Sequence, residues 1–206
     1  MFITFEGPEG AGKTTILARI AERLKQQFDV LVTREPGGIK IAEEIRTVIL
    51  NPNHINMHER TEALLYAAAR SQHYYERVAP AIQQNKIVIC DRFIDSSLAY
   101  QGYARGLGIE EVKKINEFAI GHIMPDCTIL FDLDPAIGLE RITTNNRESN
   151  RLDKESLAFH MKVREGYLKV AEMYPNRIVI INAEDTIDKV EQQVWQVVYE
   201  RLNKSK

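Results

Sequence analysis

The 206-residue sequence is poor in cysteine and contains no long hydrophobic run. Each of its two cysteines, Cys90 and Cys127, lies in an apolar stretch typical of a buried strand, which favours core thiols over a disulfide or a metal pair. No apolar stretch reaches the roughly 18 residues of a membrane-spanning helix. The first residues are strand-like and do not resemble a charged and apolar leader. We therefore expect a soluble, cytoplasmic protein with no membrane partner.

An excess of positive charge is also missing. The formal net charge is −2 and the isoelectric point is about 6.2. Such a chain has no basic field for a nucleic-acid duplex, so we expect no nucleic-acid partner. Any anion that it binds should be small and held locally. The length is that of one domain, residues 1–206, with a full α/β core.

The sequence does contain a complete phosphate-binding motif. The stretch Gly7-Pro8-Glu9-Gly10-Ala11-Gly12-Lys13-Thr14 reads G-x-x-x-x-G-K-T, and it lies between a strand-like run and an amphipathic helical one. The glycines let backbone N–H groups turn around an anion, and the following helix adds its positive end. Lys13 is expected to reach the outer phosphates of ATP, and Thr14 to bind Mg²⁺. These residues and Thr15 are the predicted ATP-binding residues, and the alternative is a glycine-rich turn that binds nothing.

Strand-like and helical runs alternate along the whole chain. This order predicts an α/β fold in which a parallel sheet is covered by helices on both faces. The expected strands are 2–5, 30–33, 87–90, 128–133 and 178–181, and the expected helices are 13–27, 41–50, 58–84, 109–121, 135–143, 153–174 and 186–203. Asp153 is a candidate cap for the helix that starts there.

Two acidic side chains end predicted strands at the edge where α/β proteins bind their ligands. Asp91 follows the apolar run 87–90, and Glu6 follows the first strand. Together with Thr14 these two carboxylates are the predicted Mg²⁺ ligands, with Asp91 acting through water. A strand-terminal acid alone could also serve a turn or a cap, but the preceding P-loop favours the metal.

A regulatory GTPase is disfavoured by two missing motifs. The guanine-reading pattern Asn-Lys-x-Asp is not formed by 85–88, which reads Asn-Lys-Ile-Val. The switch pattern Asp-x-x-Gly is absent after Asp91, which is followed by Arg92, Phe93 and Ile94. The P-loop is therefore expected to serve an enzyme, although an ATP-driven binding module or switch remains an alternative.

Two further segments, joined to the P-loop in this order and spacing, closely resemble the thymidylate kinase (dTMP kinase) family. They are Arg-Glu-Pro-Gly-Gly at 34–38 and Asp-Arg-Phe-Ile-Asp-Ser-Ser-Leu-Ala-Tyr-Gln-Gly at 91–102, and the likeness runs from Phe2 to about Ala183. The resemblance implies a three-layer P-loop kinase fold with a five-stranded parallel sheet. It also implies transfer of the ATP γ-phosphoryl group to dTMP with Mg²⁺, and a homodimer. A deoxynucleoside kinase, whose acceptor is a hydroxyl, is the alternative from nearby chemistry.

The residues suit a thymine pocket. If 58–84 is helical, Tyr66 and Arg70 share one face, where a ring can stack on a base and a guanidinium can donate to its carbonyl. Ser97, Tyr100 and Gln101 follow helical spacing and would face one ligand. The resemblance makes Tyr66 the stacking aromatic and Arg70 the donor to thymine O4. It implies that Tyr100 crowds the sugar 2′ position, while Gln101 suits the N3–H and carbonyl edge.

Arginines are the expected clamp for the acceptor phosphate. By resemblance, Arg34 and Arg92 take this role, Arg46 assists, and a cis peptide precedes Pro36. Glu6 is also a candidate contact of dTMP. The predicted catalytic groups are Lys13, Asp91, Arg92 and Arg147.

A polar interruption at 143–153 is read as a lid. Some family members carry an arginine inside the P-loop, where this chain has Glu9. The resemblance to the bacterial type therefore implies that the lid supplies the catalytic cation, with Arg147 ranked ahead of Arg151, which is also a predicted ATP contact. Asn182 matches a loop that borders adenine. Without the resemblance, 143–151 could equally be a solvated loop.

Overall fold

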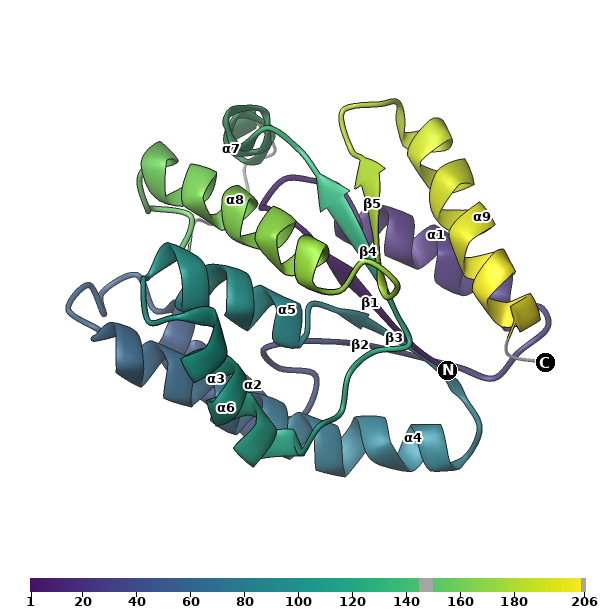
Figure 1. The fold of residues 1–206 in the computed structure, drawn as a ribbon, viewed down its shortest axis with the longest axis horizontal. Helices are drawn as coiled ribbons and strands as arrows, with labels where there is room; N and C mark the ends of the chain where they lie inside the picture. Colours follow the sequence, from purple (N-terminus) through teal and green to yellow (C-terminus); the bar gives the residue numbers. More distant parts are fainter. Residues whose placement is uncertain (145–149, 205–206) are drawn as a thin grey trace.

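A five-stranded parallel sheet forms the centre of the molecule (Figure 1). The computed structural model describes residues 1–144 and 150–204. The strands, in the spatial order β2-β3-β1-β4-β5, are β1 (Phe2–Glu6), β2 (Val30–Arg34), β3 (Ile87–Asp91), β4 (Cys127–Asp132) and β5 (Ile178–Asn182). Every pairing is parallel. The five strands predicted from apolar runs are confirmed to within a residue or two at each end.

Helices cover both faces of the sheet and make three layers. Helices α1 (Lys13–Lys25) and α9 (Ile187–Lys204) lie on one face. The remaining helical segments are α2 (Lys40–Leu50), α3 (Glu59–His73), η1 (Tyr74–Val78), α4 (Ala79–Gln83), α5 (Ile94–Ser97), η2 (Leu98–Ala104), α6 (Ile109–Ile120), α7 (Pro135–Thr144) and α8 (Leu157–Met173). In the part of the chain that the structure describes, no helix has the length and apolar character to cross a bilayer.

The hydrophobic core has two parts, one on each face of the sheet, because successive side chains along a strand point to opposite faces. Ile3 and Phe5 of β1 point towards α1 and α9, whereas Phe2 points towards the helices of the opposite face. Cys90 and Cys127 are both buried free thiols, as the sequence indicates. Because both faces of the sheet are covered, its strands carry apolar residues almost continuously.

The predicted helix 58–84 forms over nearly its full length, from Glu59 to Gln83, but it contains one wide turn and is not regular throughout. Helix α3 ends at His73 and is followed by the wide-turn segment η1, in which the Ala79 N–H donates to the Tyr74 carbonyl five residues earlier. The physical reason is Pro80, which has no N–H and whose ring would collide with a carbonyl four residues back in a regular helix. The wider turn lets the chain continue into α4.

A second wide-turn segment, η2, replaces the short regular helix expected around 97–101. The Arg105 N–H donates to the Tyr100 carbonyl, again five residues back. The wider turn changes which side chains share a face, so Ser97, Tyr100 and Gln101 do not all point to one ligand.

The start of α8 also differs from its prediction. The helix begins at Leu157, and Ser156 is its cap, because the Ser156 side chain accepts a hydrogen bond from the Phe159 N–H. Asp153 does not cap α8. It instead accepts from the Asn150 N–H in the turn before the helix.

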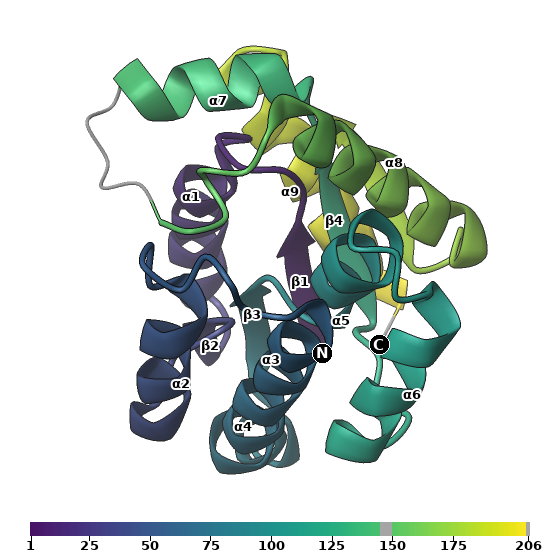
Figure 2. The ribbon, with the colours of Figure 1, turned by 90° about the vertical axis from the view of Figure 1, so that its left-hand side faces the viewer.

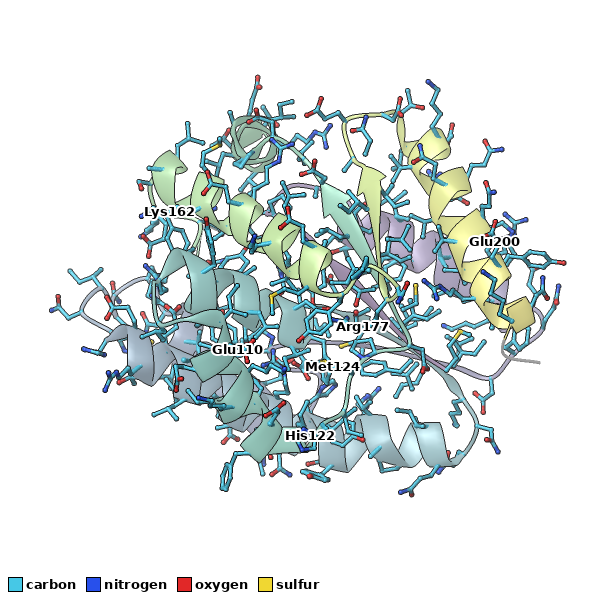
Figure 3. The ribbon with its side chains drawn as sticks, in the orientation of Figure 1. Glu110, His122, Met124, Lys162, Arg177 and Glu200 are labelled. Atoms are coloured by element: carbon cyan, nitrogen blue, oxygen red, sulfur yellow. The ribbon has the colours of Figure 1, made fainter. Side chains whose placement is uncertain are left out.

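Arg177, at the junction of α8 and β5, ties α5 to the sheet (Figure 3). Its guanidinium makes two 2.7 Å hydrogen bonds to the two carboxylate oxygens of Asp95. Asp95 in turn accepts from the Thr128 hydroxyl of β4. This cluster fixes the segment that carries Arg92 and Ser96 against the sheet.

Candidate functional site

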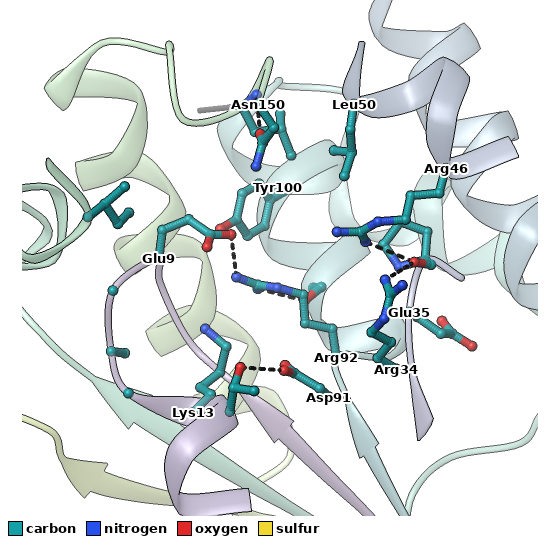
Figure 4. A pocket seen from close by; sticks show the side chains of 18 of the residues that line it. Glu9, Lys13, Arg34, Glu35, Arg46, Leu50, Asp91, Arg92, Tyr100 and Asn150 are labelled. Carbon is teal, nitrogen blue, oxygen red and sulfur yellow. Dashed lines mark hydrogen bonds and ion pairs between the residues drawn. The ribbon is translucent and has the colours of Figure 1, made fainter. Parts of the chain in front are cut away.

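A cleft of about 680 Å³ opens at the carboxyl ends of β1 and β3 (Figure 4). This is the expected place in a parallel α/β sheet, and the ribbon in Figure 2 shows the arrowhead of β1 at this edge. It lies between the P-loop and the segments that follow β2 and β3. The residues that line it are Glu9, Gly10, Ala11, Gly12, Lys13, Thr14, Thr15, Arg34, Glu35, Pro36, Arg46, Leu50, Tyr66, Asp91, Arg92, Ser96, Tyr100, Gln101, Arg141, Ile142, Asn150 and Leu152. Most of the predicted site residues therefore meet in one cavity.

The P-loop wraps around the Lys13 side chain. The ammonium group donates to the backbone carbonyls of Gly7 (3.0 Å) and Pro8 (2.8 Å), which lie behind the cleft wall. Burial, assisted by the charge of Arg92, lowers the pKa of Lys13 to about 8. The negative charges of Glu9 and Asp91 oppose this shift. Lys13 is therefore mostly protonated at neutral pH but loses its proton at a much lower pH than an exposed lysine.

We expect kcat/KM for ATP to fall as pH rises through about 8. The protonated form of Lys13 is the one that binds phosphate, and kcat/KM reports ionisations of the free enzyme. Bound polyphosphate favours the charged amine, so kcat should fall at a higher pH than kcat/KM does. Initial rates from pH 6 to 10, in buffers of constant ionic strength, measure the pH dependence of both quantities. A kcat/KM that does not change up to pH 10 would contradict the lowered pKa of Lys13.

Asp91 and Thr14 meet at the mouth of the P-loop (Figure 4). The Thr14 hydroxyl donates to the Asp91 carboxylate at 3.1 Å. No cluster of three or more metal-binding side chains occurs among the described residues. A hydroxyl and one carboxylate nevertheless fit Mg²⁺, which keeps several waters and completes its shell with substrate phosphates.

Glu6 lies beneath the cleft and does not line it. Its fully buried carboxylate accepts hydrogen bonds from the Phe93 N–H (2.7 Å), the Ser96 hydroxyl (2.5 Å) and the Tyr167 hydroxyl (3.0 Å). Burial, followed by the charge of Asp95, raises the pKa of Glu6 to about 7. Glu6 therefore supports the segment after β3 and is not part of the cleft lining.

Arg92 extends across the middle of the cleft (Figure 4). Its guanidinium pairs with Glu9 at 2.6 Å and also donates to Tyr167 (2.8 Å) and Ser96 (3.2 Å). The backbone of Arg92 is left-handed, with φ 70°, which is a strained conformation for a side chain of this size. Glu9 therefore does face inward, and Arg92 balances its charge.

Two more arginines converge on the carbonyl oxygen of Pro36. Arg46 donates to it at 2.9 Å and Arg34 at 3.4 Å, and Arg34 also pairs with Glu43 at 2.7 Å. The Glu35–Pro36 peptide is cis. Burial and the adjacent charge of Arg34 lower the pKa of Arg46. An anion bound beside Arg34 and Arg46 would reduce the repulsion between their two charges.

The predicted base-reading residues separate into two layers. Tyr66, Tyr100 and Gln101 line the cleft, and the buried Tyr100 hydroxyl has no hydrogen-bond partner within 1–144 and 150–204. Arg70 and Ser97 lie behind them and bond to each other at 2.9 Å. The structure thus brings all five residues together, but only Tyr66, Tyr100 and Gln101 line the cleft.

Of the two arginines predicted for the lid, the structure describes Arg151 alone. Arg147 falls outside the described residues. Arg151 is buried, donates to the Ile49 carbonyl (2.8 Å) and pairs with Glu62 at 2.5 Å, so it faces away from the P-loop side of the cleft. The Asn182 side chain accepts from the Glu184 N–H in a turn and is not part of the cleft wall.

Comparison with known proteins decides the family. A family model described as thymidylate kinase matches residues 5–194. The chain belongs to the thymidylate kinase family. It is 62% identical over 191 residues to a thymidylate kinase of a Geobacillus species, covering 92% of this chain and 91% of that one. The thymidylate kinase of Clostridium novyi is 62% identical over 195 residues, covering 94% and 95%. The crystal structure of thymidylate kinase from Ehrlichia chaffeensis has a TM-score of 0.79 at 33% identity, over 97% and 98% of the two chains.

One cationic side chain that lines the cleft, Arg141, was not predicted from the sequence. Arg141, in the last turn of α7, lines the cavity and points its guanidinium at the carbonyls of Gly10 (3.4 Å) and Ala183 (3.5 Å). It therefore joins the P-loop to the loop after β5. A signal was present, because Arg141 lies two residues before the polar interruption that starts at Thr143, but the long separation in sequence hides its proximity to Gly10.

Two glycines let α7 touch the P-loop. A Cβ atom at Gly138 would lie 2.2 Å from the Glu9 carbonyl oxygen, and one at Gly10 would lie 2.2 Å from the Gly138 carbonyl oxygen. Gly10 also has φ +73°. Backbone contact at this point requires glycine on both sides.

We expect Gly138→Ala to raise the KM for ATP and to lower stability by about 1–3 kcal/mol, the usual cost of overpacking. The methyl group would push α7 off the P-loop, so the phosphate-binding backbone loses its support. ATP kinetics and urea unfolding measure the two effects. Glu140→Ala, an exposed position on the same helix, should change neither. An unaltered ATP KM in Gly138→Ala would show that α7 does not support the loop.

Proposed function

We infer that this cleft is where the chain carries out the reaction of its family, the Mg²⁺-dependent transfer of the ATP γ-phosphoryl group to dTMP in the synthesis of dTTP. The observation that carries this inference is the position of Arg92. Its guanidinium lies between the P-loop with Lys13 on one side and the Arg34–Arg46 pair on the other (Figure 4). Two phosphate sites that share a central cation are what a transfer between two nucleotides requires.

The donor site consists of the P-loop. The backbone from Gly7 to Gly12, with Pro8, Glu9 and Ala11, surrounds the phosphates, and Lys13, Thr14 and Thr15 open α1 beneath them. Thr14 and Asp91 are the residues that would hold Mg²⁺, which supplies charge neutralisation on the phosphate oxygens. Arg141 is well placed to lie against the adenine, and Arg151 and Asn182 are not.

The acceptor site consists of the opposite wall. Arg34, Arg46 and Arg92 clamp the monophosphate, Tyr66 stacks on the base, and Gln101 reads its edge. Tyr100 crowds the sugar 2′ position, since it lines the acceptor side of the cleft beside Arg92. Arg70 and Ser97 support this layer from behind.

No protein nucleophile is needed. Catalysis rests on holding the acceptor phosphate oxygen in line with the γ-phosphoryl group and on neutralising the charge that spreads over the transferred group. Lys13 and Arg92 supply fixed cations, and Arg147 is the proposed lid cation. Glu6 keeps the Arg92–Phe93 backbone in position through its bond from the Phe93 N–H.

An acceptor panel tests the assignment. ATP and Mg²⁺ are supplied with each nucleoside and deoxynucleoside monophosphate, and ADP and dTDP are measured. Rapid dTDP formation with dTMP is expected. Thymidine in place of dTMP tests the deoxynucleoside kinase alternative, and ATP hydrolysis independent of any acceptor would favour a binding module or switch.

We also propose that the chain forms one domain and works as a cytoplasmic homodimer. The two cores lie on opposite faces of one sheet, which supports a single folding unit. Large apolar side chains are exposed on the adjoining helices α3 and α6, where Leu64 is 56% and Phe118 95% accessible. Analytical ultracentrifugation should give a dimer mass, and Phe118→Asp should shift the equilibrium towards monomer. A monomer at all concentrations would contradict this.

A further inference from the structure

Glu62 is a buried carboxylate on α3 that does not line the cleft. It is 1% exposed and accepts four hydrogen bonds. The donors are Gln101 Nε2 (2.9 Å), Arg105 Nε (3.3 Å), Arg105 Nη2 (3.2 Å) and Arg151 Nη2 (2.5 Å). Burial opposes ionisation, but the charge of Arg105, the Gln101 bond and Arg151 outweigh it and lower the pKa of Glu62. The group is therefore a carboxylate at neutral pH.

An ionised carboxylate accepts hydrogen bonds and cannot donate them. Only the NH₂ end of the Gln101 amide can therefore face Glu62, and the amide oxygen Oε1 must point the other way. Amide orientation is normally ambiguous, but here the chemistry of the partner decides it. Gln101 lines the cleft, and in the described part of the chain its side chain makes one hydrogen bond, from Nε2 to Glu62, and none at Oε1.

The pyrimidine bases differ in what they offer to such an amide. Thymine and uracil present an N3–H donor beside the O4 acceptor, whereas cytosine presents an N3 acceptor beside the N4 donor. A freely rotating glutamine could serve either base by turning through half a circle. With Glu62 in place, the turned amide would put its oxygen against a buried carboxylate, a repulsive contact of the kind used to reject wrong partners.

We propose that Glu62 is a positioning residue that enforces rejection of cytosine by locking the orientation of the Gln101 amide. The inference rests on the proposed function, because it takes the base of the acceptor nucleotide to meet Gln101. Arg105 and Arg151 contribute indirectly, since their charges keep Glu62 ionised.

The test is the Glu62→Gln variant, assayed with dTMP, dUMP and dCMP as acceptors. The new amide can turn its NH₂ group towards Gln101, and Gln101 then presents its own NH₂ group to the cleft. The ratio of kcat/KM for dTMP to that for dCMP should fall by about 10- to 100-fold, the equivalent of one or two hydrogen bonds. The ratio of dTMP to dUMP should stay unchanged, because both bases share the same edge.

Matched controls separate orientation from damage to the buried ion cluster. Glu155→Gln removes the other carboxylate that pairs with Arg105, at 2.5 Å, but does not touch Gln101, so both ratios should be retained. Should Glu62→Gln fail to fold, the double variant Glu62→Gln/Arg105→Gln removes one charge of each sign, and its dTMP to dCMP ratio should fall as predicted for the single variant.

The outcomes distinguish this inference from the proposed function. If the unmodified chain does not phosphorylate dTMP, the proposed function fails. If it does, and either folded Glu62 variant loses rate on all three acceptors by the same factor, Glu62 has a structural role alone and the inference is overturned. A dTMP to dCMP ratio that falls equally in Glu155→Gln would overturn it as well.

Discussion

Lys13→Ala should lower kcat for dTDP formation by about 10²–10³-fold, the usual cost of removing a group that stabilises charge in the transition state. The Lys13 ammonium donates to the Gly7 and Pro8 carbonyls of the P-loop, so it lies next to the place where the phosphates of ATP would bind and can exchange these bonds for phosphate oxygens. Steady-state rates at saturating ATP and dTMP measure the loss.

The same substitution should leave the fold intact. Burial disfavours the charged form of Lys13, as its lowered pKa indicates, so the folded state does not depend on this charge. Lys13 is also not part of either hydrophobic core. Circular dichroism and thermal unfolding check this point. Lys25→Ala, an exposed position in the last turn of the same helix, is the matched control and should retain the full rate. A folded Lys13→Ala protein with near-normal kcat would contradict the assignment of the P-loop.

Arg70→Ala should lower the free energy of unfolding by about 3–5 kcal/mol, the range found when one partner of a buried ion pair is removed. The Arg70 guanidinium is 2% exposed and bonds to Glu35 at 2.8 Å. It also donates to Ser97, Asn116 and the Phe93 carbonyl. Without it the Glu35 carboxylate keeps the buried His73 as its remaining side-chain partner at 2.9 Å.

Urea unfolding of Arg70→Ala measures this loss, and dTMP kinetics at low temperature, where the variant is folded, should show a raised KM as well. The reason is that Ser97 and the backbone at Phe93 lose their anchor beneath the cleft. Arg46→Ala is the control, because Arg46 is only half-buried and bonds to a backbone carbonyl, so its loss should affect stability little. Equal stability of the two variants would mean that the Arg70 network does not hold the site together.

The sheet and the P-loop could be read from the sequence because both depend on local patterns. The apolar run 87–90 ends at Asp91 in the structure as the pattern predicts, and the G-x-x-x-x-G-K-T spacing leads directly into α1. In each case the information lies within a few adjacent residues, so periodicity and composition are sufficient.

What the sequence could not predict depends on contacts between distant segments. Arg151 seemed to be a lid cation by its neighbours, yet it pairs with Glu62, which lies 89 positions away along the chain. Arg70 shares a helix face with Tyr66, but the buried Glu35 draws it behind the cleft wall. Ser97 ends the regular helix α5 and accepts a hydrogen bond from Arg70, whereas Tyr100 and Gln101 belong to the wide turn η2. Helical spacing across 97–101 assumes one regular helix, which the chain does not form there.

The pairing of Glu9 with Arg92 affects how an acceptor leaves as well as how it binds. The Glu9 carboxylate already pairs with the Arg92 guanidinium. If Arg92 binds the acceptor phosphate as proposed, the phosphate must exchange with this carboxylate, and its binding free energy at Arg92 is the difference between the two ion pairs. A competing carboxylate of this kind limits how tightly the diphosphate product is held and helps to displace it. On this proposal, an acidic residue in a loop that binds anions speeds turnover by easing product release.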